Sequence, residues 1–214
     1  MSRINVKQIR REIKSQQGKL LVREATELVN EKVFIPAVEK LQNDFANDLV
    51  TQEIRAGNDS ENISDTLKDV KVKGHPANLF SYIGFDNGTD PTEKIEKFFY
   101  FNAEYGPNFK YIRGSQEENL RFSFLFDEPS KEAIYKATPL PWAGGISWAE
   151  RIEKGLPNLS QFLAGQGLKG SRSDGGIQVK NDVSPSAQFQ PRPYLSKLIE
   201  DYINEIKKRA RRKI

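Results

Sequence analysis

Residues 21–49 read LVREATELVNEKVFIPAVEKLQNDFANDL, and this stretch decides how the N-terminal part of the chain folds. Its apolar residues recur at three- and four-residue spacings, as one face of a helix requires. The positions that set this spacing are Leu21, Ala25, Leu28, Val38, Leu41, Phe45 and Leu49. Because Pro36 lacks a backbone N–H, we expect it to kink or divide the helix. Gly57 and Asn58 are typical of a helix end, so the helical stretch should stop there.

The C-terminal segment predicts a second amphipathic helix. Pro193 begins it, because proline favours the first position of a helix. An apolar stripe follows at helical spacing, made of Tyr194, Leu195, Leu198, Ile199, Tyr202, Ile203 and Ile206. We expect this stripe to face the core and the charged residues between its members to face solvent.

Short aromatic segments between the two helices predict a small antiparallel sheet. Residues 79–85, LFSYIGF, are typical of a strand, and residues 108–113 and 120–126 suggest a hairpin. In the second strand of that hairpin, aromatic residues alternate with others, which predicts one aromatic face. The fold class expected is therefore α+β, with the N-terminal and C-terminal helices packed on a small antiparallel β-sheet.

Several smaller elements follow from local signals. Ser64 is a candidate cap for a short helix that begins near Asp65, and the pair His75-Pro76 is typical of a turn. Pro91 should start a helix that runs to about Phe101. A short helix over 147–154 is expected, since Ser147 and Glu150 form a capping-box pattern.

The stretch from residue 129 to residue 190 is rich in proline, glycine and serine and has no long periodic segment. A structureless loop of this length is unusual inside a compact domain, so we interpret it as an extended arm that orders on a neighbour. The expected organisation is a helix-and-sheet core over 1–128, the arm over 129–190, and a returning C-terminal helix over 191–214.

Trp142 and Trp148 carry the strongest signal in this arm. Tryptophan is costly to expose and is enriched at the centres of interfaces, so both are candidates for packing between subunits. The alternative is a small satellite core under the loop. The full set of candidate interface residues is Trp142, Trp148, Phe162, Tyr194 and Leu195.

Charge is distributed unevenly along the chain of 214 residues, whose formal net charge is +4. Residues 1–19 carry six Lys/Arg and one Glu, a net charge of +5, and residues 207–214 carry six Lys/Arg, which leaves −7 for the rest. Such asymmetry suggests contact with an acidic neighbour or with nucleic acid, unless the basic residues only solvate the chain ends. The candidate contact residues are Lys207, Lys208, Arg209, Arg211, Arg212 and Lys213.

Composition argues against several functional classes. The chain has no cysteine, which excludes a disulfide scaffold, a zinc finger and a thiol nucleophile. We expect no membrane span and no signal peptide, which makes a cytoplasmic origin the simplest account. The single histidine, His75, precedes a proline and has no nucleophile motif near it. Residues 86–90 and 165–171 only partly match a calcium loop and a phosphate loop, so no catalytic, metal or cofactor site is expected.

The order of these elements resembles the tail-completion or neck proteins of tailed phages, which include head–tail connector, minor tail and tail-terminator proteins. The resemblance rests on the segments LFSYIGF at 79–85 and WAERIEKG at 148–155, and on the PRPYL entry at 191–195 into the last helix. It is diffuse, and the segment 129–145 departs most from the pattern.

The resemblance implies a non-enzymatic virion protein that is assembled in the host cytoplasm and forms a ring, commonly hexameric, through which DNA passes. Its partners would be copies of itself, a connector or adaptor, and tail-tube or sheath proteins, without cofactor or membrane. A non-specific nucleic-acid-binding module that uses the basic ends is the alternative, and a hydrolase with an unrecognised site is a third possibility.

Overall fold

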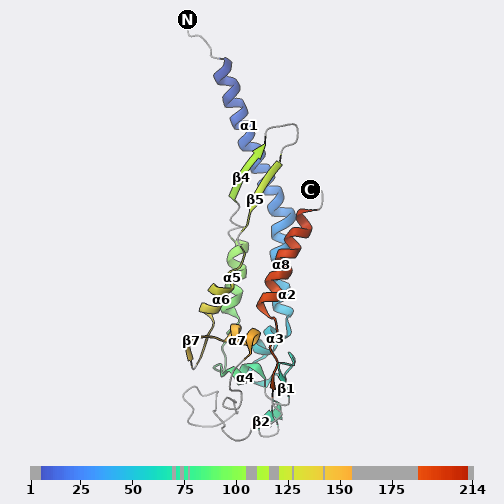
Figure 1. Ribbon diagram of the computed structural model, residues 1–214, viewed down its shortest axis with the longest axis vertical. Helices are drawn as coiled ribbons and strands as arrows, with labels where there is room; N and C mark the ends of the chain where they lie inside the picture. Colours follow the sequence, from blue (N-terminus) through green and yellow to red (C-terminus); the bar gives the residue numbers. More distant parts are fainter. Residues whose placement is uncertain are drawn as a thin grey trace.

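The computed structural model describes residues 6–68, 71–72, 75–76, 78–104, 110–115, 121–126, 128–141, 143–155 and 188–211. The molecule is elongated and has an α+β fold, with helices along most of its length and short strand pairs at several levels (Figure 1). The N-terminal helix extends upward beyond the rest of the molecule, and the last helix lies beside the lower continuation of the first (Figure 1).

The long N-terminal helix is divided, as Pro36 predicts. Helix α1 covers Val6–Val29, a π-helical turn η1 covers Asn30–Phe34, and α2 covers Ile35–Asn47. Proline cannot donate the hydrogen bond that would continue an α-helical ladder, so the widened turn directly before it has a local cause. The chain stays helical through the junction, so α1 and α2 remain joined end to end.

Helix α3, Leu49–Ala56, follows α2 after a break at Asp48. The Asp48 side chain accepts a hydrogen bond from the backbone N–H of Val50 at 2.9 Å, which caps the new helix. Gly57 ends α3 with φ of 73°, a conformation that favours glycine, and confirms the stop predicted there. A short 3-10 turn, η2, covers Gly57–Asp59.

Three helices enclose the centre of the core. Helix α8, Leu195–Ala210, packs on α2, and α5, Glu93–Glu104, packs on α2 as well. Phe45 of α2 lies edge-on to Phe99 of α5 at 5.2 Å between ring centroids, and stacks on Tyr194 at 6.2 Å. The apolar faces predicted for α2 and α8 are buried, which confirms that these helices form the scaffold of the fold.

Among the described residues the strands form four separate two-stranded antiparallel pairs. The predicted hairpin is present as β4, Lys110–Ser115, and β5, Arg121–Leu125, with an irregularity in register between Tyr111 and Gly114. The other strands are short: β1 covers Leu67–Lys68, β2 Lys71–Val72, β3 His75–Pro76, β6 Pro139–Leu140, β7 Ala143–Ser147 and β8 Gln188–Phe189. Pairing of β1 with β8 connects the middle of the chain to the segment that precedes α8.

The segment LFSYIGF is not a strand. Its first five residues form helix α4, Leu79–Ile83, and Gly84 ends this helix with φ of 81°. The Asn78 side chain accepts a hydrogen bond from the backbone N–H of Ser81 at 2.9 Å, so a local cap decides in favour of a helix. High strand propensity in so short a stretch is overridden by this cap and by burial of both sides of the turn.

Three further local predictions also need correction. Ser64 caps no helix, because its backbone N–H donates to Glu53 and strand β1 follows. The pair His75-Pro76 is strand β3, which pairs with β2, instead of a turn. Helix α5 begins at Glu93, two residues after Pro91, and continues to Glu104.

The expected arm does not begin at residue 129. Residues 128–155 form helix α6, Lys131–Ala137, the β6–β7 pair, and helix α7, Trp148–Lys154. The Ser147 side chain caps α7 by accepting from the backbone N–H of Glu150 at 3.1 Å, which confirms the predicted capping pattern. Apolar side chains from this segment are buried in the main core: Ile134, Leu140, Trp148, Ala149 and Ile152. The rest of the predicted arm, 156–187, lies outside the described residues.

Candidate functional site

The predicted interface aromatics prove to be core residues where they are described. Trp148 is only 1% exposed, lies edge-on to Phe85 at 5.4 Å between ring centroids, and has its backbone N–H bonded to Thr138 at 2.8 Å. Tyr194 and Leu195 are equally buried, at the start of α8. The interface interpretation is therefore wrong for these three residues, and the alternative of an internal core is correct.

Trp142 and Phe162 lie outside the described residues, so their assignment to an interface stays a prediction. The physical reason for the other three corrections is the same in each case. Helix α7 packs against α6 and α8, and α8 packs against α2, so the chain itself supplies the neighbours that these side chains need.

Glu53 is the most buried carboxylate of the described residues. Its two oxygens accept hydrogen bonds from two backbone N–H groups, that of Ser64 at 2.7 Å and that of Leu79 at 2.6 Å. Burial raises the pKa of the Glu53 carboxyl, while the bonds from Ser64 and Leu79 and the charge of Arg192 oppose that rise. Arg192 itself donates to the backbone carbonyl of Ser64 at 2.8 Å. Glu53 thus joins α3 to the start of α4 and to the loop before β1.

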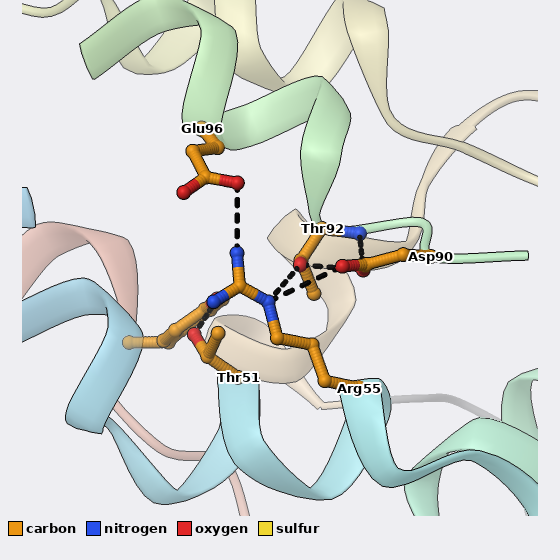
Figure 2. A network of polar contacts seen from close by, with 6 residues as sticks. Thr51, Arg55, Asp90, Thr92 and Glu96 are labelled. Carbon is orange, nitrogen blue, oxygen red and sulfur yellow. Dashed lines mark hydrogen bonds and ion pairs between the residues drawn. The ribbon is translucent and has the colours of Figure 1, made fainter. Parts of the chain in front are cut away.

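Arg55 forms the centre of a second polar network, shown in Figure 2. Its guanidinium donates to the carboxylate of Glu96 at 2.9 Å and to the hydroxyl of Thr92 at 2.9 Å, and lies 3.3 Å from Asp90. The same group lies over the ring of Phe45 at 5.5 Å from its centroid. Asp90 in turn accepts from the backbone N–H and the hydroxyl of Thr92, at 2.8 and 2.6 Å. The network fixes the start of α5 on α3.

Next to this network, the hydroxyl groups of Thr51 and Tyr194 are hydrogen-bonded at 2.6 Å and both are buried. Burial raises the pKa of the Tyr194 phenol well above its usual range. The tyrosine is therefore a neutral partner that holds the beginning of α8 against α3, and its chemistry is that of a structural hydrogen bond.

A third cluster joins α6, α7 and α8. Glu153 accepts hydrogen bonds from the hydroxyl of Tyr135 at 2.5 Å, and from the backbone N–H and hydroxyl of Ser196 at 2.5 and 2.9 Å. Burial and the Glu153 carboxylate together raise the pKa of the Tyr135 phenol. As in the other two clusters, each polar group has a partner from a different element, which is the arrangement expected of a structural clamp.

The hydrogen bonds of these clusters stabilise the fold. Within the part of the chain that the structure describes, no group of three or more His, Asp or Glu side chains is placed to hold a metal ion. The Asp86–Asp90 segment is a turn, in which the backbone N–H and the hydroxyl of Thr89 donate to the carbonyl of Asp86, as its turn-forming residues suggest. None of the helices described is both long enough and apolar enough to cross a bilayer.

The exposed apolar residues of α1 and its junction with α2 form the candidate functional surface. Leu20, Leu21, Leu28 and Ile35 are 56%, 39%, 41% and 46% exposed. Leu21 and Leu28 of α1 are spaced by seven residues, so they lie along one side of that helix, and Ile35 follows them directly after η1. We call these three residues the α1 stripe. The spacing in the sequence groups Leu21 and Leu28 with Leu41 and Phe45 on one helix face, but in the structure Leu41 and Phe45 are buried whereas Leu21 and Leu28 are exposed.

The difference is explained by how far the body of the molecule extends along the N-terminal helix. Burial on the N-terminal helix begins at Val33 and Phe34, inside η1, and continues through Ala37, Val38 and Leu41 of α2. Phe34 lies edge-on to Phe126, just after the hairpin, at 5.6 Å between ring centroids. Above this level Leu21 and Leu28 remain 39% and 41% exposed in the described part of the structure. The seven-residue repeat was the available sequence signal for an uncovered helix face, but three- and four-residue periodicity concealed it.

The basic C-terminal residues lie at the end of α8. Arg209 is an ion-pair partner of Glu205 at 2.7 Å, and Lys208 lies 3.7 Å from the same carboxylate. Lys207 and Arg211 are exposed, and no ion pair is found for either of them in the described part of the chain. Arg212 and Lys213 lie outside the described residues. The structure thus brings together four of the six predicted basic residues, two of which share an acidic neighbour.

Comparison of the chain with family models, with curated proteins and with solved structures found no match.

Proposed function

We propose that this protein is a structural component of a tailed-phage virion that assembles into a ring at the neck or head–tail junction, through which DNA passes. The observation that carries the proposal is the α1 stripe, because apolar side chains along an otherwise projecting helix are typical of a surface completed by another chain. The resemblance to neck and tail-completion proteins supplies the biological setting.

Two further features support a structural role over an enzymatic one. The polar groups around Glu53, Arg55 and Glu153 form hydrogen bonds with one another or with the backbone, so these clusters hold secondary-structure elements together. We propose that they do not bind or transform a substrate. The acidic middle of the sequence would repel DNA and suits a passage along which DNA must slide, while the basic ends suit acidic neighbours. We therefore propose no catalytic activity and no cofactor.

The proposal is tested by electron microscopy of the purified full chain over a range of concentrations, alone and with connector and tail-tube proteins. We expect closed particles with a single subunit stoichiometry, which native mass spectrometry would give directly. A protein that remains monomeric under all these conditions would contradict the proposal.

A second candidate function, non-specific contact with nucleic acid, is favoured by one specific observation. Lys207 and Arg211 are exposed at the end of α8 and can neutralise phosphates, since no acidic partner is found for them in the described residues. Retention on DNA at low salt should then fall when residues 207–214 are deleted, and the salt dependence should become shallower. Unchanged retention after the deletion would exclude the basic tail from DNA contact.

A further inference from the structure

Acidic residues lie beside the α1 stripe and restrict the kind of surface that could bind there. Glu24 and Glu31 are each three residues beyond a leucine of the stripe, and Glu27 lies between them at helical spacing. Residues three and four apart are neighbours on a helix surface, so the glutamates line one side of the stripe. We call these three residues the acidic row. The surface thus combines exposed leucines with an adjacent line of negative charge.

The ion pairs already made by this row are weak. Arg23 donates to Glu27 at 2.8 Å, and Lys32 to Glu31 at 2.6 Å, and all four side chains are more than half exposed. Water screens exposed pairs of this kind and they contribute little to stability, so the glutamates can change partner at little cost. A matching partner is a helix with apolar residues at helical spacing and a positive charge beside them.

Residues 6–19 of the chain have this chemistry. They carry five Lys/Arg and one Glu, a net charge of +4, and Val6, Ile9 and Ile13 follow one another at three- and four-residue spacing. The lengths also match, because at 1.5 Å per residue both residues 6–19 and the stretch from Leu21 to Ile35 span about 20 Å. Residues 21–35 carry two Lys/Arg and three Glu, a net charge of −1, so the two stretches have opposite charge and similar length.

The basic half cannot satisfy the acidic half of its own molecule. Residues 6–29 are one continuous helix, and a continuous helix cannot fold back on itself. Figure 1 shows α1 extending away from the body in one direction, so its first half is carried further from the stripe of the same chain. Only a second copy can bring the two surfaces together.

We propose that residues 6–19 of one copy pack on the α1 stripe and acidic row of the next copy, in a head-to-tail contact. This inference rests on the proposed function and names the contact that would join neighbouring subunits. Because the contact uses different surfaces on the two chains, it repeats from copy to copy and produces a ring where the rotation closes. A contact of about two heptads is weak alone, so assembly should depend strongly on concentration.

The test uses two charge-reversal variants of the full chain. The first replaces the acidic row (Glu24→Lys, Glu27→Lys and Glu31→Lys), and the second replaces three basic residues of the first half of α1 (Lys7→Glu, Arg10→Glu and Lys14→Glu). Each variant alone places like charges on the two surfaces, so we expect its association to be weaker than that of the wild type by at least tenfold. In an equimolar mixture every contact between unlike chains again joins opposite charges.

The decisive result is therefore recovery of association in the mixture, with a 1:1 composition by native mass spectrometry. A matched control reverses three exposed glutamates that lie away from α1, Glu61→Lys, Glu128→Lys and Glu200→Lys, and should associate like the wild type. Circular dichroism checks that every variant keeps its helix content. Variants that associate as well as the wild type, or folded variants whose mixture stays monomeric, would overturn the head-to-tail contact.

These results also separate the contact from the proposed function. Closed particles that are insensitive to both charge reversals would leave the ring standing and remove this contact. Recovery in the mixture with only open chains, even when connector and tube proteins are added, would support the contact and contradict the ring at the neck. A wild-type chain that never associates would overturn both.

Discussion

The part of the molecule below η1 and the helix α1 above it are built on opposite principles. In the body, large side chains such as Trp148 and Phe45 are buried, and polar groups such as Glu53 are matched with partners from distant elements. On α1, leucines remain exposed and the charged side chains pair with near neighbours in sequence. The comparison indicates that the body provides the stability of the fold, whereas α1 carries the exposed surface on which the proposed contact rests.

The largest effect on stability is expected from the body, at Trp148. Replacement of Trp148 by alanine would leave a cavity where the indole packs on Phe85, at a cost of about 3–5 kcal/mol in the free energy of unfolding. Urea denaturation followed by circular dichroism measures this loss. A loss below about 1 kcal/mol would show that the segment 128–155 is not part of the cooperative core.

Glu53→Gln should have the next largest effect. The glutamine side chain has one acceptor oxygen, so one of the two backbone N–H groups, of Ser64 or Leu79, would face an amide donor. We expect a loss of about 2 kcal/mol in the same urea experiment. The exposed Glu61→Gln is the matched control and should change stability by less than about 0.5 kcal/mol. Equal losses of stability from the two substitutions would show that the hydrogen bonds of Glu53 do not stabilise the fold.

Arg55→Lys should cost less, because the guanidinium is 28% exposed and water screens its ion pairs. Lysine keeps the charge but loses the planar fork that reaches Glu96 and Thr92 together, and the contact with the ring of Phe45. The expected loss is about 1 kcal/mol, measured as a lower midpoint of thermal unfolding. Arg23→Lys on α1 is the control and should leave the midpoint unchanged, since that arginine makes one exposed pair.

The smallest effect on folding is expected on α1 itself. The double substitution Leu21→Ser and Leu28→Ser removes exposed apolar surface, so the stability of the monomer should change by less than about 0.5 kcal/mol. Association measured by sedimentation should nevertheless weaken. The matched control, Leu49→Ser with Ile63→Ser, alters two side chains of similar exposure off α1 and should leave association intact. A large loss of monomer stability in the α1 variant would show that the stripe packs within its own chain.

The same contrast explains how much of the fold could be read from the sequence. The helices around Leu41 and Leu198 repeat over several turns, so their apolar faces were predicted correctly, and the alternation in 121–125 predicted the β4–β5 hairpin. Short elements were less predictable, because one side-chain cap decides them. The Asn78 bond to Ser81 made a helix of a stretch whose composition favoured a strand.

The candidate site was harder to predict than the fold. Burial of Trp148 depends on Phe85, just after α4, meeting α7 in space, which no local pattern reports, so an aromatic in a glycine-rich stretch was mistaken for an interface residue. Exposure of Leu28 depends on where the body ends along the helix, which is also a tertiary property. The charges at the two ends were predictable, since they need only the order of residues.

The π-helical turn η1 has a consequence for how insertions and deletions would act on this protein. Successive residues of an α-helix are rotated by about 100°, so a change of one residue within Asn30–Phe34 would rotate all of α1 about its axis by roughly that angle. The leucines would then point in a different direction although none of them had changed. The number of residues in η1 thus sets the direction in which the exposed leucines of α1 face.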